Sequence, residues 1–204
     1  MKKETFSKIV RAIAKIIRAV TVPPIMVSGL LISLFATNRD IFQEKSILNL
    51  VLAILFLALI PIAAYPLQPL IPKYKDKGRE GQRDLAFLLT PVGYVGAVLY
   101  GIIVPISPDL MLIFLSYLLS VLALLFFNKV IKFRSSGHMC SVTGPLILIS
   151  HFIGGTIIPS CILFALVCWS SLLLKRHTLY EVIGGCACCL VSFACSLGIV
   201  ALVF

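Results

Sequence analysis

The chain has 204 residues, of which 60% are hydrophobic and only 13% are charged. Its mean hydropathy of +1.08 leaves too few polar side chains to cover a water-soluble core, which excludes a soluble globular domain. The apolar fraction is too high for a disordered chain, and the chain is too long for a disulfide-rich secreted scaffold. The net charge of +10 lies in short basic clusters between apolar runs, so we expect anionic lipid headgroups and phosphate, and no nucleic acid, as partners.

The N-terminal residues predict an amphipathic helix in the membrane interface. Between residues 5 and 20, cations recur on one helical face and apolar side chains on the other. The cations are Lys8, Arg11, Lys15 and Arg18, and the apolar residues are Phe6, Ile9, Ile13, Ile16, Ile17 and Val20. This pattern is typical of a basic helix that binds the surface of a membrane. We therefore expect residues 1–20 to form an interfacial helix before the first span.

The remaining sequence predicts an all-α, polytopic transmembrane bundle with six to seven spans. A span requires about 20 mostly apolar residues. Apolar runs occupy residues 19–37, 47–71, 85–106, 109–128, 140–157, 158–174 and 182–204. With short loops, these runs use nearly the whole chain, so we expect residues 1–204 to form a single integral membrane domain.

The distribution of cations predicts which side of the membrane each loop faces. With seven crossings, the N-terminus and the loops at 72–84, 129–138 and 175–181 share one side. That side carries all of the 18 Lys and Arg residues except Arg39 and Lys45. By the positive-inside rule it is the cytoplasmic face of the cell (inner) membrane. Alternatively, some of these cations bind substrate and are unrelated to topology.

Polar residues in two of these loops have the types that phosphate chemistry requires. Ser136-Gly137-His138 opens a predicted span, so the backbone N–H groups and the positive helix end face outward, toward a phosphate. About two antiparallel spans separate His138 from His177, so the two imidazoles return to one membrane level. Glu181 follows His177 by one helical turn, where its carboxylate would fix the imidazole tautomer. Two histidines facing each other in a basic pocket indicate phosphoryl transfer.

In order and spacing, residues 70–190 resemble the type 2 phosphatidic acid phosphatase superfamily, membrane lipid phosphatases related to acid phosphatases and vanadium haloperoxidases. Ser136-Gly137-His138 matches the second part of the three-part family signature, and His177-Thr-Leu-Tyr-Glu181 matches the third, with Glu in place of Asp. The resemblance implies that His177 attacks phosphorus to form a phosphohistidine, that Glu181 orients His177, and that His138 protonates the leaving alkoxide. It implies no metal, no other cofactor and no obligate protein partner.

The resemblance also implies a set of phosphate-binding groups. Arg83 matches the Arg of the first signature part, and Lys75 is the nearest candidate for its Lys. The full expected set is Arg83, Lys75, Arg134, Ser136, Gly137 and Arg176. Where the family has a phosphate-binding Arg, six residues before His177, this chain has Ser171, which removes a cation that would stabilise the transition state. Arg176 is a poor substitute, because neighbours on a helix point about 100° apart.

Together these features predict a phosphatase that hydrolyses the phosphomonoester or diphosphate of a lipid, either a prenyl diphosphate or a phosphatidate-like lipid. Ser171 keeps an alternative open, a non-catalytic family member that binds or presents a phospholipid or polyprenyl phosphate. We interpret the run from Cys186 to Cys189 as small residues that let helices pack closely, because neighbours on one helix do not converge on a metal ion. We expect His151 to be a hydrogen-bonded structural histidine.

Overall fold

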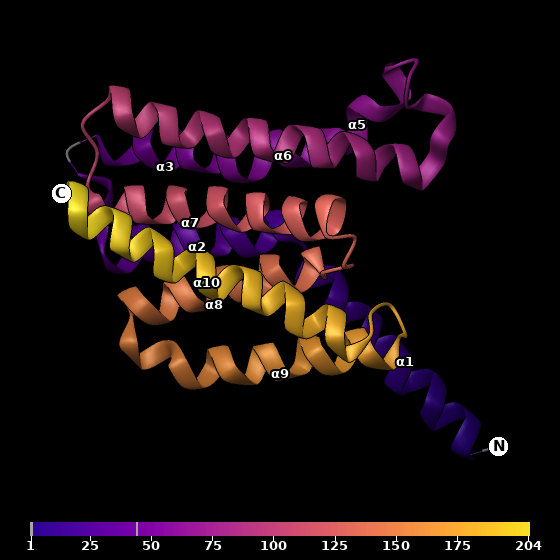
Figure 1. Cartoon of the computed structure of the whole chain (residues 1–204). Coiled ribbons are helices and arrows are strands. Elements are labelled where there is room, and N and C mark those ends of the chain that lie inside the picture. The colour runs from indigo at the N-terminus through magenta and orange to yellow at the C-terminus, as the bar shows by residue number, and fades with distance from the viewer. Residues whose placement is uncertain (1, 44) are drawn as a thin grey trace.

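The computed structural model describes the backbone of residues 2–43 and 45–204 and the side chains of residues 6–43 and 45–204. All regular elements in these residues are helices, as predicted. The main ones are α1 (Lys2–Val20), α2 (Pro23–Thr37), α3 (Ser46–Ile54), α6 (Gly78–Ile103), α7 (Pro108–Leu125), α8 (Gly137–Phe152), α9 (Ile157–Leu173) and α10 (Leu179–Val203). Apart from α1, they run side by side along one direction (Figure 1).

Short helical segments connect or extend these helices. They are η1 (Arg39–Phe42), η2 (Leu55–Leu59), α4 (Ile60–Ile62), α5 (Ala64–Leu67), η3 (Gln68–Leu70), η4 (Lys75–Lys77), η5 (Phe126–Val130) and η6 (Gly154–Thr156). The segments from η2 to η3 continue the direction of α3, and three prolines within them interrupt the regular backbone hydrogen bonding.

By length and composition, five stretches of helix in the described residues are able to cross a membrane. They are Ser46–Leu70, Lys75–Ile103, Pro108–Val130, Gly154–Leu173 and Leu179–Val203. The bent pair formed by α1 and α2 brings the number to as many as six. Helix α8 is not among them, because it has only 16 residues and ends before the glycines of η6. The all-helical fold is thus confirmed, with five or six stretches long and apolar enough to span a membrane, and the predicted count of six to seven spans stays a prediction.

A sharp bend separates α1 from α2. The two helices meet at 59°. Thr21 ends α1 with backbone and hydroxyl bonds to the Ile17 carbonyl, and Pro23 and Pro24 start α2, where no backbone N–H is required. The second half of α1 packs against α9, with Ala14 fully buried. The interfacial position of α1 stays a prediction, but this half of the helix is part of the bundle.

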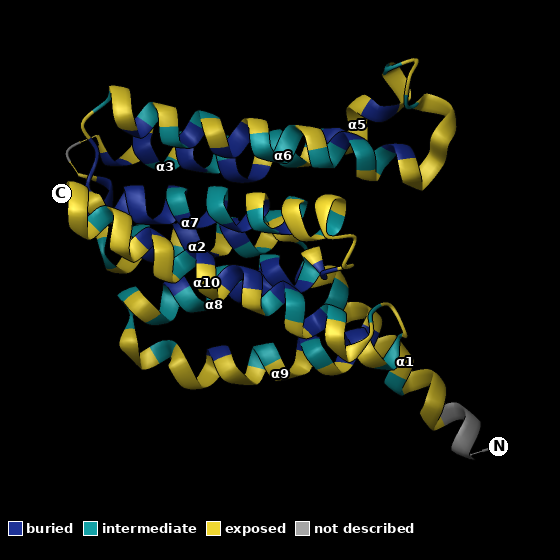
Figure 2. Ribbon diagram, viewed as in Figure 1, coloured by how far each residue is buried: buried dark blue, intermediate teal, exposed yellow. Residues whose placement is uncertain are grey.

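The core has two main parts with α7 near the middle of the bundle (Figure 2). The larger part joins α2, α3, α6 and α7 and contains the fully buried Leu31, Phe42 and Phe114. A smaller part joins α8, α9 and α10 through Met139 and Val167, with Val182 beside them. Exposed apolar side chains cover the outer faces of α6, α9 and α10, as expected for surfaces that meet lipid.

Candidate active site

A cavity of about 1040 Å³ lies among α1, α2, α6, α7, α8 and α10. Four arginines and two histidines line part of it: Arg18, Arg83, Arg134, His138, Arg176 and His177. Farther along the helices its wall is largely apolar and aromatic, with Tyr94, Tyr117, Val121, Leu124, Leu148 and Phe193. The cavity therefore has a cationic part and an apolar part, which complement the anionic head and the apolar tail of an amphiphile.

The start of α10 positions the first histidine. Thr178 caps the helix by accepting a hydrogen bond from the Glu181 backbone N–H (3.3 Å), and Glu181 Oε2 accepts one from the Thr178 N–H (3.1 Å). The same Oε2 lies 2.9 Å from Nδ1 of His177. A carboxylate only accepts, so Nδ1 carries the proton and Nε2 keeps its lone pair. This arrangement leaves the lone pair of His177 Nε2 free, as a nucleophile requires.

The turn before α10 places two neighbouring residues on the cavity wall. Arg176 and His177 both line it. The expectation that Arg176 points away is wrong, because it assumed a helix, whereas residues 174–178 form a non-helical turn. The Arg176 backbone N–H donates to the carbonyl of Ser171, which closes this turn onto the end of α9.

The start of α8 positions the second histidine. As predicted, a helix begins at this point, and Ser136 caps it by accepting a hydrogen bond from the Met139 N–H (3.3 Å). His138 is partly buried, and its Nε2 lies 3.4 Å from the hydroxyl of Thr21 at the α1–α2 bend. The first turn of α8 thus presents His138 to the cavity beside the end of α1.

A backbone contact ties the two histidine segments together. The Ser136 N–H donates to the Glu181 carbonyl at 2.9 Å. A Cβ atom at Gly185 would overlap the Ser136 carbonyl oxygen, and one at Gly184 would lie 2.6 Å from the Phe133 ring. Glycine at these two positions lets α10 approach residues 133–136 closely, and this approach sets the spacing of His138 and His177.

Burial and positive charge keep both imidazoles neutral near pH 7. Burial, together with the charges of Arg18 and His177, lowers the pKa of His138 to about 4. Burial also lowers the pKa of His177, with help from Arg18 and Arg134, although Glu181 acts in the opposite direction. A neutral imidazole is the form that is able to act as a nucleophile. A bound phosphate would raise the pKa of His138 again, because it brings negative charge beside the ring.

Most of the expected phosphate-binding residues lie on the cavity wall. Arg83, Arg134, Gly137 and Arg176 line it, and Arg134 Nε is also 3.5 Å from Glu181 Oε1. The side chains of Ser136 and Lys75, the other two expected residues, do not line the cavity. The hydroxyl of Ser136 is buried within the helix cap, so only the adjacent backbone faces the cavity at Gly137. Lys75 is exposed on η4, in the segment that projects from the end of the bundle between α5 and α6 (Figure 1).

The sequence analysis missed Arg18 as a site residue. Its Nη1 donates to the hydroxyl of Ser171 at 3.4 Å, and it lines the cavity together with both histidines. Among the Lys and Arg side chains that the structure describes, it alone is not exposed. The available signal was the Thr21-Val-Pro-Pro break, which predicts that α1 turns away from α2 but does not identify the helix it meets.

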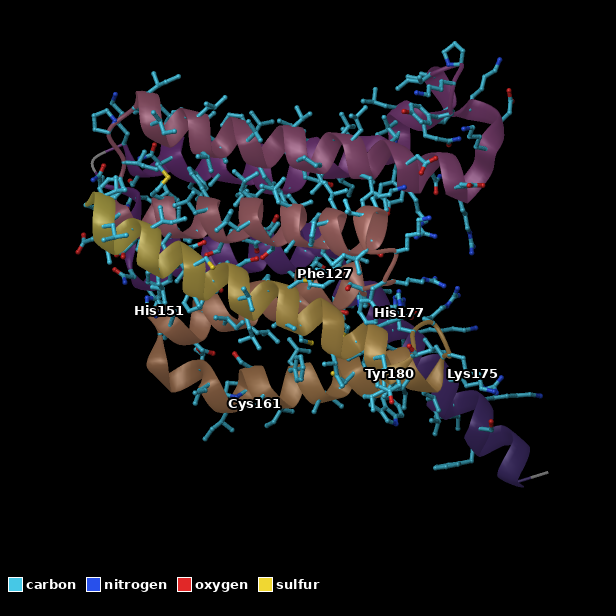
Figure 3. The ribbon with its side chains drawn as sticks, in the orientation of Figure 1. Phe127, His151, Cys161, Lys175, His177 and Tyr180 are labelled. Atoms are coloured by element: carbon cyan, nitrogen blue, oxygen red, sulfur yellow. The ribbon has the colours of Figure 1, made fainter. Side chains whose placement is uncertain are left out.

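The third histidine lies at the opposite end of the bundle from His177 (Figure 3). His151 is exposed and packs edge-on against Phe152 and Phe193, with ring centroids 4.9 and 5.4 Å away. Within the described residues its ring makes aromatic contacts only, so the expected hydrogen bond of His151 stays a prediction. The seven cysteines are free thiols, and Cys188 and Cys189 pack with Cys140 and Leu124 in a small apolar cluster.

Comparisons with known proteins add no relative to this description. No protein-family model, no curated protein and no solved structure matches the chain. The function is therefore inferred from the residues of the cavity and their geometry.

Proposed function

We propose that the protein is a membrane lipid phosphatase that releases phosphate from a lipid phosphomonoester or diphosphate through a phosphohistidine intermediate. One observation carries the proposal. Glu181 holds Nδ1 of His177, which leaves Nε2 available on the wall of a cavity shared with His138 and four arginines. A nucleophile, an orienting carboxylate, a second acid–base group and phosphate-binding cations are the parts that phosphoryl transfer by histidine requires.

Each step uses one of these groups. Nε2 of His177 attacks phosphorus while the bond to the leaving oxygen breaks, and His138 donates its proton to that oxygen. Glu181 stabilises the positive charge that develops on His177. Water then attacks phosphorus, His138 accepts a proton from that water, and the P–N bond breaks to regenerate His177. The arginines neutralise the phosphoryl oxygens in both transition states.

The shape and polarity of the cavity support a lipid substrate over a soluble phosphate ester. Its apolar wall extends along α6, α7, α8 and α10, well beyond the arginines. A prenyl chain or an acyl chain would occupy that part, and burial of each CH₂ group contributes about 0.8 kcal/mol. The alternative function, lipid-phosphate binding without turnover, is favoured by one observation, the neutral Ser171 at the place where the resemblance implies a cation.

The test is phosphate release by the purified protein in mixed micelles with excess chelator. The substrates are phosphatidate, a prenyl monophosphate and a prenyl diphosphate, and glycerol 3-phosphate is the tail-free control. We expect release from at least one lipid and little from glycerol 3-phosphate. Rapid quenching in alkali should trap a phosphoprotein that is stable in base and labile in acid. Binding of these lipids without any release would favour the alternative function.

We also propose that the active site faces the cytoplasm. The support is the concentration of cations in the N-terminal helix and in the loops at this end of the bundle. In a cysteine-free background, Lys77→Cys should resist a membrane-impermeant thiol reagent in intact cells, because Lys77 lies exposed beside the site end, and it should react after permeabilisation. A cysteine at Asn38, in the opposite loop, is the control that should react in intact cells. The reverse pattern would place the active site on the outer face.

A further inference from the structure

Arg18 is a cation that lacks a counter-ion among the residues whose side chains the structure describes. It is half-buried, and no carboxylate in the described part of the chain forms an ion pair with it. Its hydrogen-bond partner is the neutral hydroxyl of Ser171, and the nearby guanidinium of Arg176 repels it. A partly desolvated guanidinium beside a second one is electrostatically unfavourable until an anion binds between them or next to them.

The surroundings of Arg18 indicate where that anion would sit. Arg18 lines the same cavity as His138 and His177, and its charge acts on the titration of both imidazoles. One helical turn after it, Thr21 contacts His138 directly. An anion that reaches Arg18 therefore also lies beside the two groups that carry out the proposed reaction.

The fold fixes this placement from two directions. The break at Thr21 and Pro23 directs α1 away from α2, and the buried Ala14 and partly buried Ile17 hold α1 in the bundle. On the facing helix, Ser171 is fully buried and small. It leaves room for the guanidinium and offers it a hydrogen-bond acceptor, which a larger or apolar residue would not do.

We propose that Arg18 binds the transferring phosphoryl group, so that the N-terminal helix supplies the cation that the last turn of α9 lacks. This inference rests on the proposed phosphatase function and extends it to α1. The planar guanidinium would contact the phosphoryl oxygens in the transition state, together with Arg176. α1 is then part of the active site.

The test compares Arg18→Gln with Lys15→Gln, which removes the same charge from an exposed position on the same helix. Two quantities are measured, kcat/KM for lipid phosphate hydrolysis and the Kd of tungstate, a phosphate analogue, by calorimetry. We expect Arg18→Gln to lower kcat/KM by about 10²-fold or more and to weaken tungstate binding by roughly tenfold or more. Lys15→Gln should stay within about twofold of wild type in both. Thermal unfolding of both variants controls for misfolding.

A charge exchange sharpens the test. Arg18→Ser should inactivate the enzyme, and adding Ser171→Arg should restore part of kcat/KM by returning a guanidinium to the same place from the facing helix. Ser171→Arg alone should lower activity, because it adds a second guanidinium to a fully buried position beside Arg18.

The outcomes separate this inference from the function on which it rests. If wild type releases phosphate and Arg18→Gln matches Lys15→Gln in both measurements, the role of Arg18 is wrong and the phosphatase function stands. If wild type binds tungstate in an Arg18-dependent way but hydrolyses no lipid, the phosphatase function is wrong and Arg18 remains an anion-binding residue. If wild type neither binds tungstate nor hydrolyses lipids, both are wrong.

Discussion

Two basic regions at the same end of the bundle differ in what their charges do. The segment from Lys73 to Arg79 holds four cations, all exposed and none on the cavity wall. The end of α1 contributes only Arg18 to the cavity. That side chain is half-buried, has no carboxylate partner in the described part of the chain, and lowers the pKa of both histidines. In the sequence the first region is the more conspicuous. In the structure the second region belongs to the candidate site.

The two regions differ because solvent screens their charges to different extents. Water and salt screen an exposed cation within about 10 Å, so its field hardly reaches a reacting group, although its position still influences how the chain inserts into the membrane. A partly buried cation keeps its field, because the surrounding protein screens it less. In a membrane protein, local density of positive charge thus indicates sidedness, whereas burial without a counter-ion indicates a site.

The largest effect is expected when the same comparison, a residue in the cavity against one outside it, is made for the histidines. His177→Ala should reduce phosphate release by at least about 10³-fold, because it removes the nucleophile. His151→Ala, at the other end of the bundle (Figure 3), should keep turnover within about twofold. Release assays on both purified variants, with thermal unfolding as a folding control, measure the difference. Substantial turnover by His177→Ala would exclude His177 as the nucleophile.

A smaller effect is expected when a cation is removed from the segment from Lys73 to Arg79 or from the start of α6. Arg83→Gln should lower kcat/KM by roughly 10- to 100-fold, because Arg83 lines the cavity and would form charge-assisted hydrogen bonds with the phosphate. Lys75→Gln removes the same charge outside the cavity and should change kcat/KM less than about twofold. Steady-state kinetics of both variants on one lipid substrate measure this difference in kcat/KM. Equal losses would place Lys75 in the binding machinery after all.

The smallest effect is a change in pH dependence. His177 must be neutral to attack, so activity rises with pH through its pKa, which burial lowers from 6.5. His138 must be protonated to act as the acid, so activity falls with rising pH through its pKa of about 4 in the free enzyme. The optimum of kcat/KM should thus lie below pH 6.5. Arg134→Gln should move this optimum to higher pH, because it removes a charge that lowers the pKa of His177, and Lys75→Gln should not.

To separate these ionisations from that of the substrate, each variant profile is divided by the wild-type profile on the same lipid. An optimum above pH 7, or the same profile for wild type and Arg134→Gln, would contradict this assignment of the two histidines.

The sequence predicted the local parts of the site because short-range interactions determine them. Ser136 begins α8 by capping it, and the spacing of Thr178 and Glu181 forms a capping box that also brings a carboxylate to His177. Each of these contacts joins residues at most four positions apart. The all-helical fold followed in the same way from long apolar runs.

The parts that the sequence did not predict depend on contacts between distant helices. The pairing of Arg18 with Ser171 requires that α1 lies against α9, and no local pattern encodes which helix α1 meets. Glycines and prolines shorten α8 and α2, so an apolar run overstates the length of its helix. The position of Arg176 depends on a turn that a helical extrapolation misses.

The contact between α1 and α9 also has a consequence during synthesis of the protein. Arg18 and Ser171 are 153 residues apart, which a ribosome takes roughly 8 to 30 s to translate. Until α9 has been made, the guanidinium of Arg18 lacks its partner helix. If Arg18 and His177 act together, the newly made protein becomes active only after residue 177 has emerged from the ribosome, so products truncated before His177 would be inert toward lipid phosphates.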